Sequence, residues 1–288
     1  MSRTVALRES TAFLALTYVL ALAIAISLPH AGINRMLSVL APITSVIIIT
    51  FVLTPRGQRR RMWRGIGLGR SGRSVWLIAL VVPMLLLAMA YGTALVLGVA
   101  ELKPLDLTPS GAADWTANFV VSFIVSTVFI LGEEIGWRGY LLPRVQQLTG
   151  KRRAAVATGL LHGAFHLPLI LIATTYDQYG SRWIVAPAAV ITIAAGGVFY
   201  AYLWDRSASV WPVAIAHNAA NTMFIIGAGA VVARSEADLA YVAGESGLAT
   251  LASVVIVAGI LLATAKVWRD QAQIWPSSRS SASSNVPS

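Results

Sequence analysis

Long apolar runs separated by short polar segments make up most of the chain between residues 11 and 265. A helix that crosses about 30 Å of hydrocarbon needs about 20 predominantly apolar residues. The pattern therefore predicts an all-α fold, a polytopic membrane bundle of about eight transmembrane helices. The predicted spans are residues 11–28, 36–53, 75–99, 113–142, 154–175, 184–203, 210–230 and 248–265. The first is interpreted as an uncleaved span because its apolar run exceeds the roughly 7–15 residues of a signal peptide.

Composition supports a bilayer as the main solvent of the chain. Hydrophobic residues make up 57% of its 288 residues and charged residues only 12%, whereas soluble domains carry roughly 25% charged residues. We expect one membrane-embedded domain over residues 1–275, followed by a disordered Ser-rich tail at 276–288. The absence of cysteine excludes disulfides, thiolate catalysis and Cys-ligated zinc.

The distribution of lysine and arginine predicts the orientation of the spans. Of the 22 basic residues, all but Arg35, Lys103, Arg182 and Arg234 fall on one side of the predicted topology. Cytoplasmic loops carry such an excess, so we expect a multi-pass protein of the cell membrane with both termini in the cytoplasm. Topology also accounts for the net charge of +10, and we expect the lipid bilayer, and no nucleic acid, as a partner.

Three of the predicted spans contain polar residues that a membrane-spanning helix rarely tolerates. Each span pairs two of them four residues apart, so that both point in the same direction from a helix. The pairs are Glu134 with Arg138, His162 with His166, and His217 with Asn221; Glu133 precedes the first pair. Ionisable groups inside spans are expensive and usually functional.

The depths of these groups predict that they meet. At 1.5 Å per residue, Glu133 lies ~15 Å, His166 ~18 Å and His217 ~16 Å from the cytoplasmic ends of their predicted spans. We therefore expect one pocket in the cytoplasmic half of the bilayer, reached from the cytoplasm. Small residues should let the helices approach closely; they are Gly132, Gly136, Gly159 and Gly163.

Together the motifs resemble those of the CPBP intramembrane proteases, also called the Abi family, which includes the type II CAAX prenyl endopeptidases. The family pattern is EExxxR, FxxxH and HxxxN on successive helices. Here Glu133-Glu134-x-x-x-Arg138, His166 before Leu-Pro, and His217-x-x-x-Asn221 follow that order within a motif core of residues 113–230. The chain departs from the pattern at His162, where the family usually has an aromatic residue.

The resemblance implies an intramembrane endopeptidase that cleaves a membrane-associated protein or peptide. It implies that Glu133 is the general base, that His166 holds or polarises the water, and that His217 and Asn221 stabilise the oxyanion. Glu134 and Arg138 would form a supporting ion pair, and His162 would have a packing or supporting role. On this interpretation no cofactor is required.

Several alternatives remain open from the sequence. The spacing of His162 and His166 is that of a zinc-binding helix, and His217 with Glu133 could complete a zinc site, so a zinc metalloprotease would use the same residues. Mid-membrane Glu and His also build transport pathways, although no inverted repeat is evident. A third alternative is a non-catalytic immunity or scaffolding protein. The sequence does not indicate whether the substrate is prenylated.

Overall fold

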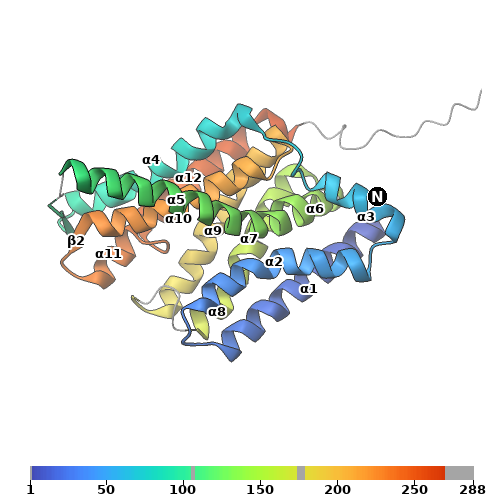
Figure 1. The fold of residues 1–288 in the computed structure, drawn as a ribbon, viewed down its shortest axis with the longest axis horizontal. Helices are drawn as coiled ribbons and strands as arrows, with labels where there is room; N and C mark the ends of the chain where they lie inside the picture. The colour runs from blue at the N-terminus through green and yellow to red at the C-terminus, as the bar shows by residue number, and fades with distance from the viewer. Residues whose placement is uncertain (1, 105–107, 174–178, 270–288) are drawn as a thin grey trace, which may run out of the picture.

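The computed structural model describes residues 2–104, 108–173 and 179–269, and it is almost entirely helical (Figure 1). The Ser-rich tail expected at 276–288 lies outside the described residues. The helices are α1 Arg3–Ser27, α2 Ile33–Val52, α3 Arg56–Gly65, η1 Arg73–Val75, α4 Trp76–Val96, α5 Pro109–Glu134, η2 Ile135–Leu141, α6 Leu142–Thr149, α7 Lys151–Phe165, α8 Leu167–Leu171, α9 Arg182–Ser207, α10 Trp211–Ala230, α11 Glu236–Ala243, α12 Leu248–Thr264 and η3 Lys266–Trp268.

One short ribbon departs from the expected all-α fold. β1 (Ala100–Leu102) pairs antiparallel with β2 (Val231–Ala233), with Ala100 opposite Ala233. It joins the ends of α4 and α10, whose packing against each other is fixed by the Tyr91 hydroxyl, which donates to the carbonyl of Phe224 at 3.1 Å. The ribbon therefore connects the end of α4 to the end of α10, the helix that carries His217 and Asn221.

The prediction of a polytopic helical membrane protein is confirmed, but the count of eight spans is not. Within the described ranges, six helical segments are long and apolar enough to cross a bilayer. They are Arg3–Ser27, Arg73–Val96, Pro109–Thr149, Lys151–Leu171, Arg182–Ser207 and Glu236–Thr264. The second predicted span corresponds to the shorter apolar segment Met36–Val52. The seventh corresponds to α10. It is not among the six because His217, Asn218 and Asn221 lower the mean hydropathy of this helix.

Close packing of α7 on α9 forms the centre of the bundle. A Cβ atom at Gly163 would lie 2.5 Å from the carbonyl oxygen of Val190, and one at Gly159 would meet that of Ala194. Only glycine permits this approach without displacing a backbone, as the small residues predicted. The contact brings α9 against the face of α7 that carries His162.

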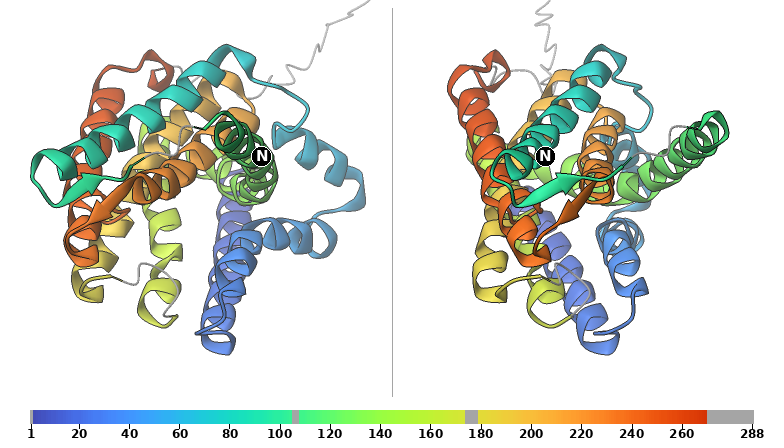
Figure 2. Two further views of the ribbon diagram at one scale, coloured as in Figure 1. Left: turned by 60° about the vertical axis from the view of Figure 1, so that its left-hand side comes forward. Right: turned by 90° about the vertical axis from the view of Figure 1, so that its left-hand side faces the viewer.

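The outer half of α5 stands away from the rest of the bundle (Figure 2). Most of its side chains before Ile130 are exposed, and they are largely apolar, as at Val121, Ile124 and Val128. From Ile130 onwards the same helix is buried on every side through Leu142. Consequently Glu133 and Glu134 lie where the helix enters the packed core.

Candidate active site

The polar groups of the three motifs meet in the core of the bundle. Glu133 is 2% exposed and Glu134 is fully buried at the end of α5, Arg138 is 1% exposed in η2, and His162 is 1% exposed in α7. Buried charges require partners, and each of these groups has one. The prediction that the motifs converge is therefore confirmed by the geometry.

A continuous chain of hydrogen bonds links the motifs. His162 Nε2 lies 2.7 Å from Glu133 Oε1, and the other ring nitrogen, Nδ1, lies 3.0 Å from Arg138 Nη1. Arg138 Nη1 also donates to both carboxylate oxygens of Glu134 at 3.0 Å. Glu134 Oε1 in turn lies 2.7 Å from His217 Nδ1. The expected ion pair is thus present, and His162 lies at the centre of the network rather than merely packing beside it.

The chemistry of Arg138 assigns the proton on His162. A guanidinium group only donates, so the Nδ1 atom of His162 accepts the bond from Arg138. The proton of the neutral ring then lies on Nε2 and is donated to Glu133. This arrangement fixes the Glu133 carboxylate in one position.

The helix carrying these acids continues through seven π-helical residues, Ile135–Leu141. A π-helical segment inserts an extra residue into the helical turn, and such segments occur frequently at functional sites. All seven residues are buried, and Trp137 packs edge-on against Phe13 and tilted against His162 with ring centroids 5.5 and 4.8 Å apart. The wider turn therefore places a large aromatic ring and Arg138 on the side of α7.

The other two imidazoles are oriented by their Nδ1 atoms. His166 Nδ1 donates to the carbonyl of His162 at 3.1 Å, and His217 Nδ1 donates to Glu134. The Tyr200 ring stacks on His217 with centroids 5.3 Å apart and an interplanar angle of 22°. Because Nδ1 of each ring is bonded in this way, Nε2, on the opposite side of the ring, points away from the carbonyl of His162 and from Glu134, respectively.

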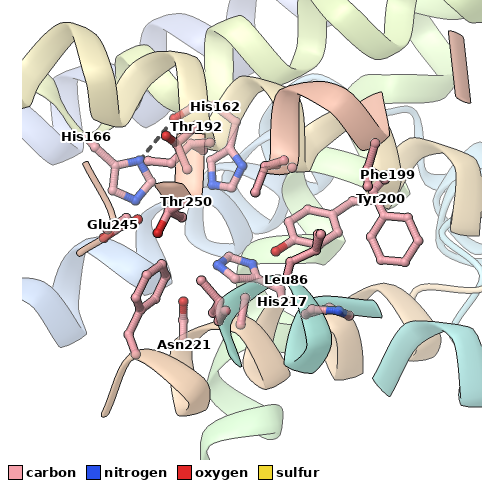
Figure 3. A pocket seen from close by; sticks show the side chains of 18 residues that line it. Leu86, His162, His166, Thr192, Phe199, Tyr200, His217, Asn221, Glu245 and Thr250 are labelled. Carbon is pink, nitrogen blue, oxygen red and sulfur yellow. Dashed lines mark hydrogen bonds between the residues drawn. The ribbon is translucent and has the colours of Figure 1, made fainter. Parts of the chain in front are cut away.

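A cavity of about 80 Å³ adjoins the network. His162, His166, His217 and Asn221 line it, as Figure 3 shows, together with apolar side chains of α4, α9 and α12. Glu133 is not among its lining residues, but a Glu133 carboxylate oxygen and ring nitrogens of His162 and His166 lie within 4.8 Å of one another. One water hydrogen-bonded to two groups spans such a distance.

The helix geometry differs from the depths expected from sequence. His166 lies 15 residues after the start of α7, which corresponds to ~22 Å, whereas His217 lies six residues after the start of α10, or ~9 Å. The groups meet although the two helices reach them over different lengths. At the start of α10, Trp211 Nε1 donates to the carbonyl of Leu68, between α3 and α4, at 2.9 Å, a contact that hydropathy does not predict.

Sequence reasoning missed four polar residues that line the cavity. They are Thr192 and Tyr200 of α9, Glu245 of the loop between α11 and α12, and Thr250 of α12. Tyr200 also lies beneath the Arg138 guanidinium, 4.9 Å from its ring centroid. No spacing pattern marks these residues, and Glu245 falls between the predicted spans 210–230 and 248–265.

The comparison with protein families matches the part of the chain that carries this network. Residues 114–223 match the model described as type II CAAX prenyl endopeptidase Rce1-like. These residues are similar to the Rce1-like CAAX endopeptidase family. The resemblance inferred from the motifs is thereby confirmed, and it indicates a peptidase. A search of curated proteins finds no match.

The Rce1-like segment contains every predicted site residue from Glu133 to Asn221. It ends before α11, so Glu245 and the helix α12 that completes the cavity lie outside it. α4, which also lines the cavity, lies before it. The matched segment therefore supplies the polar network, and flanking helices supply much of the apolar wall.

Glu133, His162 and His166 form a cluster of metal-ligand type within the Rce1-like segment. Two histidines and a glutamate are the ligand set of several catalytic zinc sites. However, a histidine that ligates a metal usually donates its other N–H to an acceptor, and here Nδ1 of His162 faces the donor Arg138. His166 and His217, by contrast, donate Nδ1–H to a carbonyl and to Glu134, which leaves their Nε2 atoms oriented as a metal ligand requires. The hydrogen bonding of His162 therefore does not fit a zinc ligand, whereas that of His166 and His217 does.

Proposed function

We propose that this chain is an intramembrane endopeptidase that hydrolyses a peptide bond of a membrane-associated protein or peptide, with Glu133 as general base. The observation that carries the proposal is the position of Glu133 and His166 within 4.8 Å of each other, at the edge of a cavity also lined by His217 and Asn221. Peptide hydrolysis needs an activated water, an oxyanion stabiliser and a proton for the leaving amine.

Water activation is assigned to Glu133 and His166. Since His166 uses Nδ1–H to bond the carbonyl of His162, its neutral ring has a lone pair at Nε2 that can accept a hydrogen bond from water. A Glu133 carboxylate oxygen then takes a proton from that water as its oxygen attacks the scissile carbonyl carbon. Glu133 later gives this proton to the leaving nitrogen as the carbon–nitrogen bond breaks.

Oxyanion stabilisation is assigned to His217 and Asn221, which lie one turn apart on α10. The side-chain amide of Asn221 donates through its NH₂ group. His217 donates through Nε2–H when its ring is doubly protonated, and Glu134 at 2.7 Å from Nδ1 then supplies the counter-charge. Removing one such donor usually lowers kcat by about 10²–10³.

The reaction we propose uses no metal. Arg138 donates to Nδ1 of His162, so the proton of that ring lies on Nε2 and is donated to Glu133. The Nε2 atom then has no lone pair for a metal. We expect purified, active protein to contain less than one equivalent of zinc and to retain activity after treatment with a chelator. Metal analysis by mass spectrometry, with the cleavage rate measured on the same sample, provides the test. A stoichiometric metal whose removal abolishes cleavage would contradict this assignment.

The proposed topology follows the charge bias of the sequence: eight membrane-crossing helices within one domain of residues 1–275, both termini in the cytoplasm, and access to the site from that side. Two of those helices are then α2, whose apolar part is shorter, and α10, which is not among the six apolar segments. We propose that α10 is tolerated because its polar side chains face partners in the core; Asn218, for example, donates to the carbonyl of Phe123 at 2.9 Å. Lipid and a membrane-associated substrate are its expected partners.

The test compares two neighbouring asparagines of α10. Synthetic membrane-segment peptides are incubated with purified full-length protein in nanodiscs, and new termini are identified by mass spectrometry. We expect Asn221→Ala to cleave about 10²–10³ times more slowly than the wild type without a change in thermal unfolding. Asn218→Ala, which loses two bonds to α5, is the matched control and should lower stability.

Cleavage by Asn221→Ala at the wild-type rate would contradict the oxyanion role. Wild-type protein that cleaves no peptide in the set, while binding the same peptides, would instead support a non-catalytic partner-binding protein.

A further inference from the structure

Two consecutive glycines of α9 face different surroundings. A Cβ atom at Gly197 would lie 2.7 Å from the Cα atom of Gly159 in α7 and 3.0 Å from Arg138 Nη2, so close packing requires glycine there. A Cβ atom at Gly196 would instead meet, among the described residues, only Val254 Cγ1 of α12 at 4.0 Å. Glycine inside a helix is destabilising relative to alanine, and at Gly196 packing gives no reason for it.

The space beside Gly196 is part of the candidate active-site cavity. Gly196 lines the cavity, as do Thr192 and Tyr200, which lie four residues before and after it and therefore on the same face of α9. Figure 3 shows both of these side chains around the same space as His217 and Asn221. The position without a side chain thus belongs to the wall that also carries the groups assigned to the oxyanion.

The rest of the wall is mainly apolar, and the cavity is small. Its apolar side chains come from α4, α9, α10 and α12, and they include Leu86, Phe199, Phe224 and Val257. A dry apolar cavity of about 150 Å³ holds a benzene molecule. A volume of about 80 Å³ therefore suits a side chain of roughly three or four carbon atoms. Valine has such a side chain, whereas an aromatic ring or a long apolar chain is too large.

We propose that Gly196 keeps open a side-chain pocket in the active site, which selects substrates with a small aliphatic residue of about the size of valine next to the scissile bond. This inference rests on the proposed peptidase activity. The aliphatic side chain fills the space beside Gly196 while the scissile carbonyl lies by His217 and Asn221. One methylene group more or less in an apolar pocket changes kcat/KM by roughly 10–200-fold, so the pocket discriminates between side chains by their volume.

The experiment uses synthetic membrane-segment peptides in which one residue at a time, on either side of the cleaved bond, is Gly, Val, Phe or an S-prenylated cysteine. Purified full-length wild type in nanodiscs is compared with Gly196→Ala and Gly196→Val. Gly259→Val is the matched control, because Gly259 of α12 is exposed and is not among the described residues that line the cavity. A Cβ atom there has no described atom within 4 Å. The readouts are kcat/KM for each peptide and the unfolding temperature of each protein.

We expect the wild type and Gly259→Val to cleave one Val peptide with a kcat/KM at least about tenfold higher than that of its Gly, Phe and prenylated counterparts. Gly196→Ala should lower the ratio of Val to Gly peptide, and Gly196→Val should bring it to one or below, because the added methyl groups occupy the pocket.

Three results would overturn the inference while leaving the peptidase activity standing. The first is a wild type that cleaves the Gly, Phe or prenylated peptide as fast as the Val peptide at every position. The second is a Val-to-Gly ratio that Gly196→Ala leaves unchanged. The third is unfolding of Gly196→Ala, because its position would then not be open. Absence of any cleavage that depends on Glu133 would overturn the proposed function and this inference with it.

Discussion

At the residue scale, two neighbouring carboxylates have different partners. Glu134 is held by Arg138 and His217, whereas Glu133 receives one bond from His162 and faces His166. The motifs predicted the pairing of Glu134 with Arg138, because the spacing i,i+4 in a helix brings these side chains together. They did not predict the central place of His162, since that depends on which face of α7 meets η2. No spacing rule contains that information.

The buried ion pair leads to a prediction about stability. Replacing Arg138 by Met leaves Glu134 buried without its guanidinium and leaves His162 without its donor, so we expect the free energy of unfolding to fall by about 3–5 kcal/mol. Arg234→Met is the matched control, because Arg234 pairs with Glu101 on the surface; it should cost less than about 1 kcal/mol. Thermal or denaturant unfolding in detergent measures both. Equal losses would show that the buried network does not stabilise the fold.

His162 is expected to act as a positioning residue for Glu133. His162→Phe, which introduces the aromatic residue usual in the family, removes the bond to Glu133 and should reduce kcat by about tenfold with little change in KM. His162→Gln keeps a donor near Glu133 and should recover part of that loss. Steady-state kinetics on the three proteins test this role. A His162→Phe variant as active as the wild type would assign His162 to packing alone.

At the element scale, the position of the site follows from how closely α7 approaches α9. The sequence indicated the glycines that permit this contact, and the short distances from Gly159 and Gly163 to the backbone of α9 confirm it. The π-helical segment Ile135–Leu141 and the late start of α10 were not predictable. Both depend on tertiary contacts: Trp137 packs against Phe13 and His162, and Trp211 at the start of α10 bonds the carbonyl of Leu68.

Packing of α7 on α9 predicts different outcomes for two glycine substitutions. Gly159→Ala places a methyl group against the carbonyl of Ala194 and should lower the free energy of unfolding by about 1–3 kcal/mol through overpacking. Gly92→Ala in α4 adds a methyl group where no atom lies within 4 Å and should be close to neutral. Unfolding midpoints in the same detergent give the comparison. A neutral Gly159→Ala would mean that α7 and α9 are not in close contact.

At the scale of the whole molecule, the sequence predicted a helical membrane bundle correctly because hydropathy reports the solvent of each segment. The count of eight spans stays a prediction, because six segments are long and apolar enough by themselves to cross a bilayer. α10 has polar residues that point to internal partners, and α2 is short in its apolar part, so hydropathy alone does not class them with the other six. The contribution of Glu245 to the cavity wall was not predictable from the sequence either, because a residue in a loop belongs to no periodic pattern.

The orientation can be tested directly because the chain has no cysteine. We expect Arg60→Cys, an exposed position of α3, to react with a membrane-impermeant maleimide only after cells are opened. Asp238→Cys, an exposed position of α11, should react in intact cells, since the basic loops lie in the cytoplasm. Labelling with the opposite pattern would invert the topology and place access to the site on the other side.

The most direct test of the proposed mechanism is the rate of peptide-bond cleavage by purified wild type and Glu133→Gln in matched nanodiscs. The side-chain amide of the variant would still accept the bond from His162 through its oxygen but cannot take a proton from water, so the fold should persist while the general base is lost. We predict equal unfolding temperatures and a rate at least about 10²-fold lower for the variant. Equal rates for the two proteins would contradict the role of Glu133 as general base.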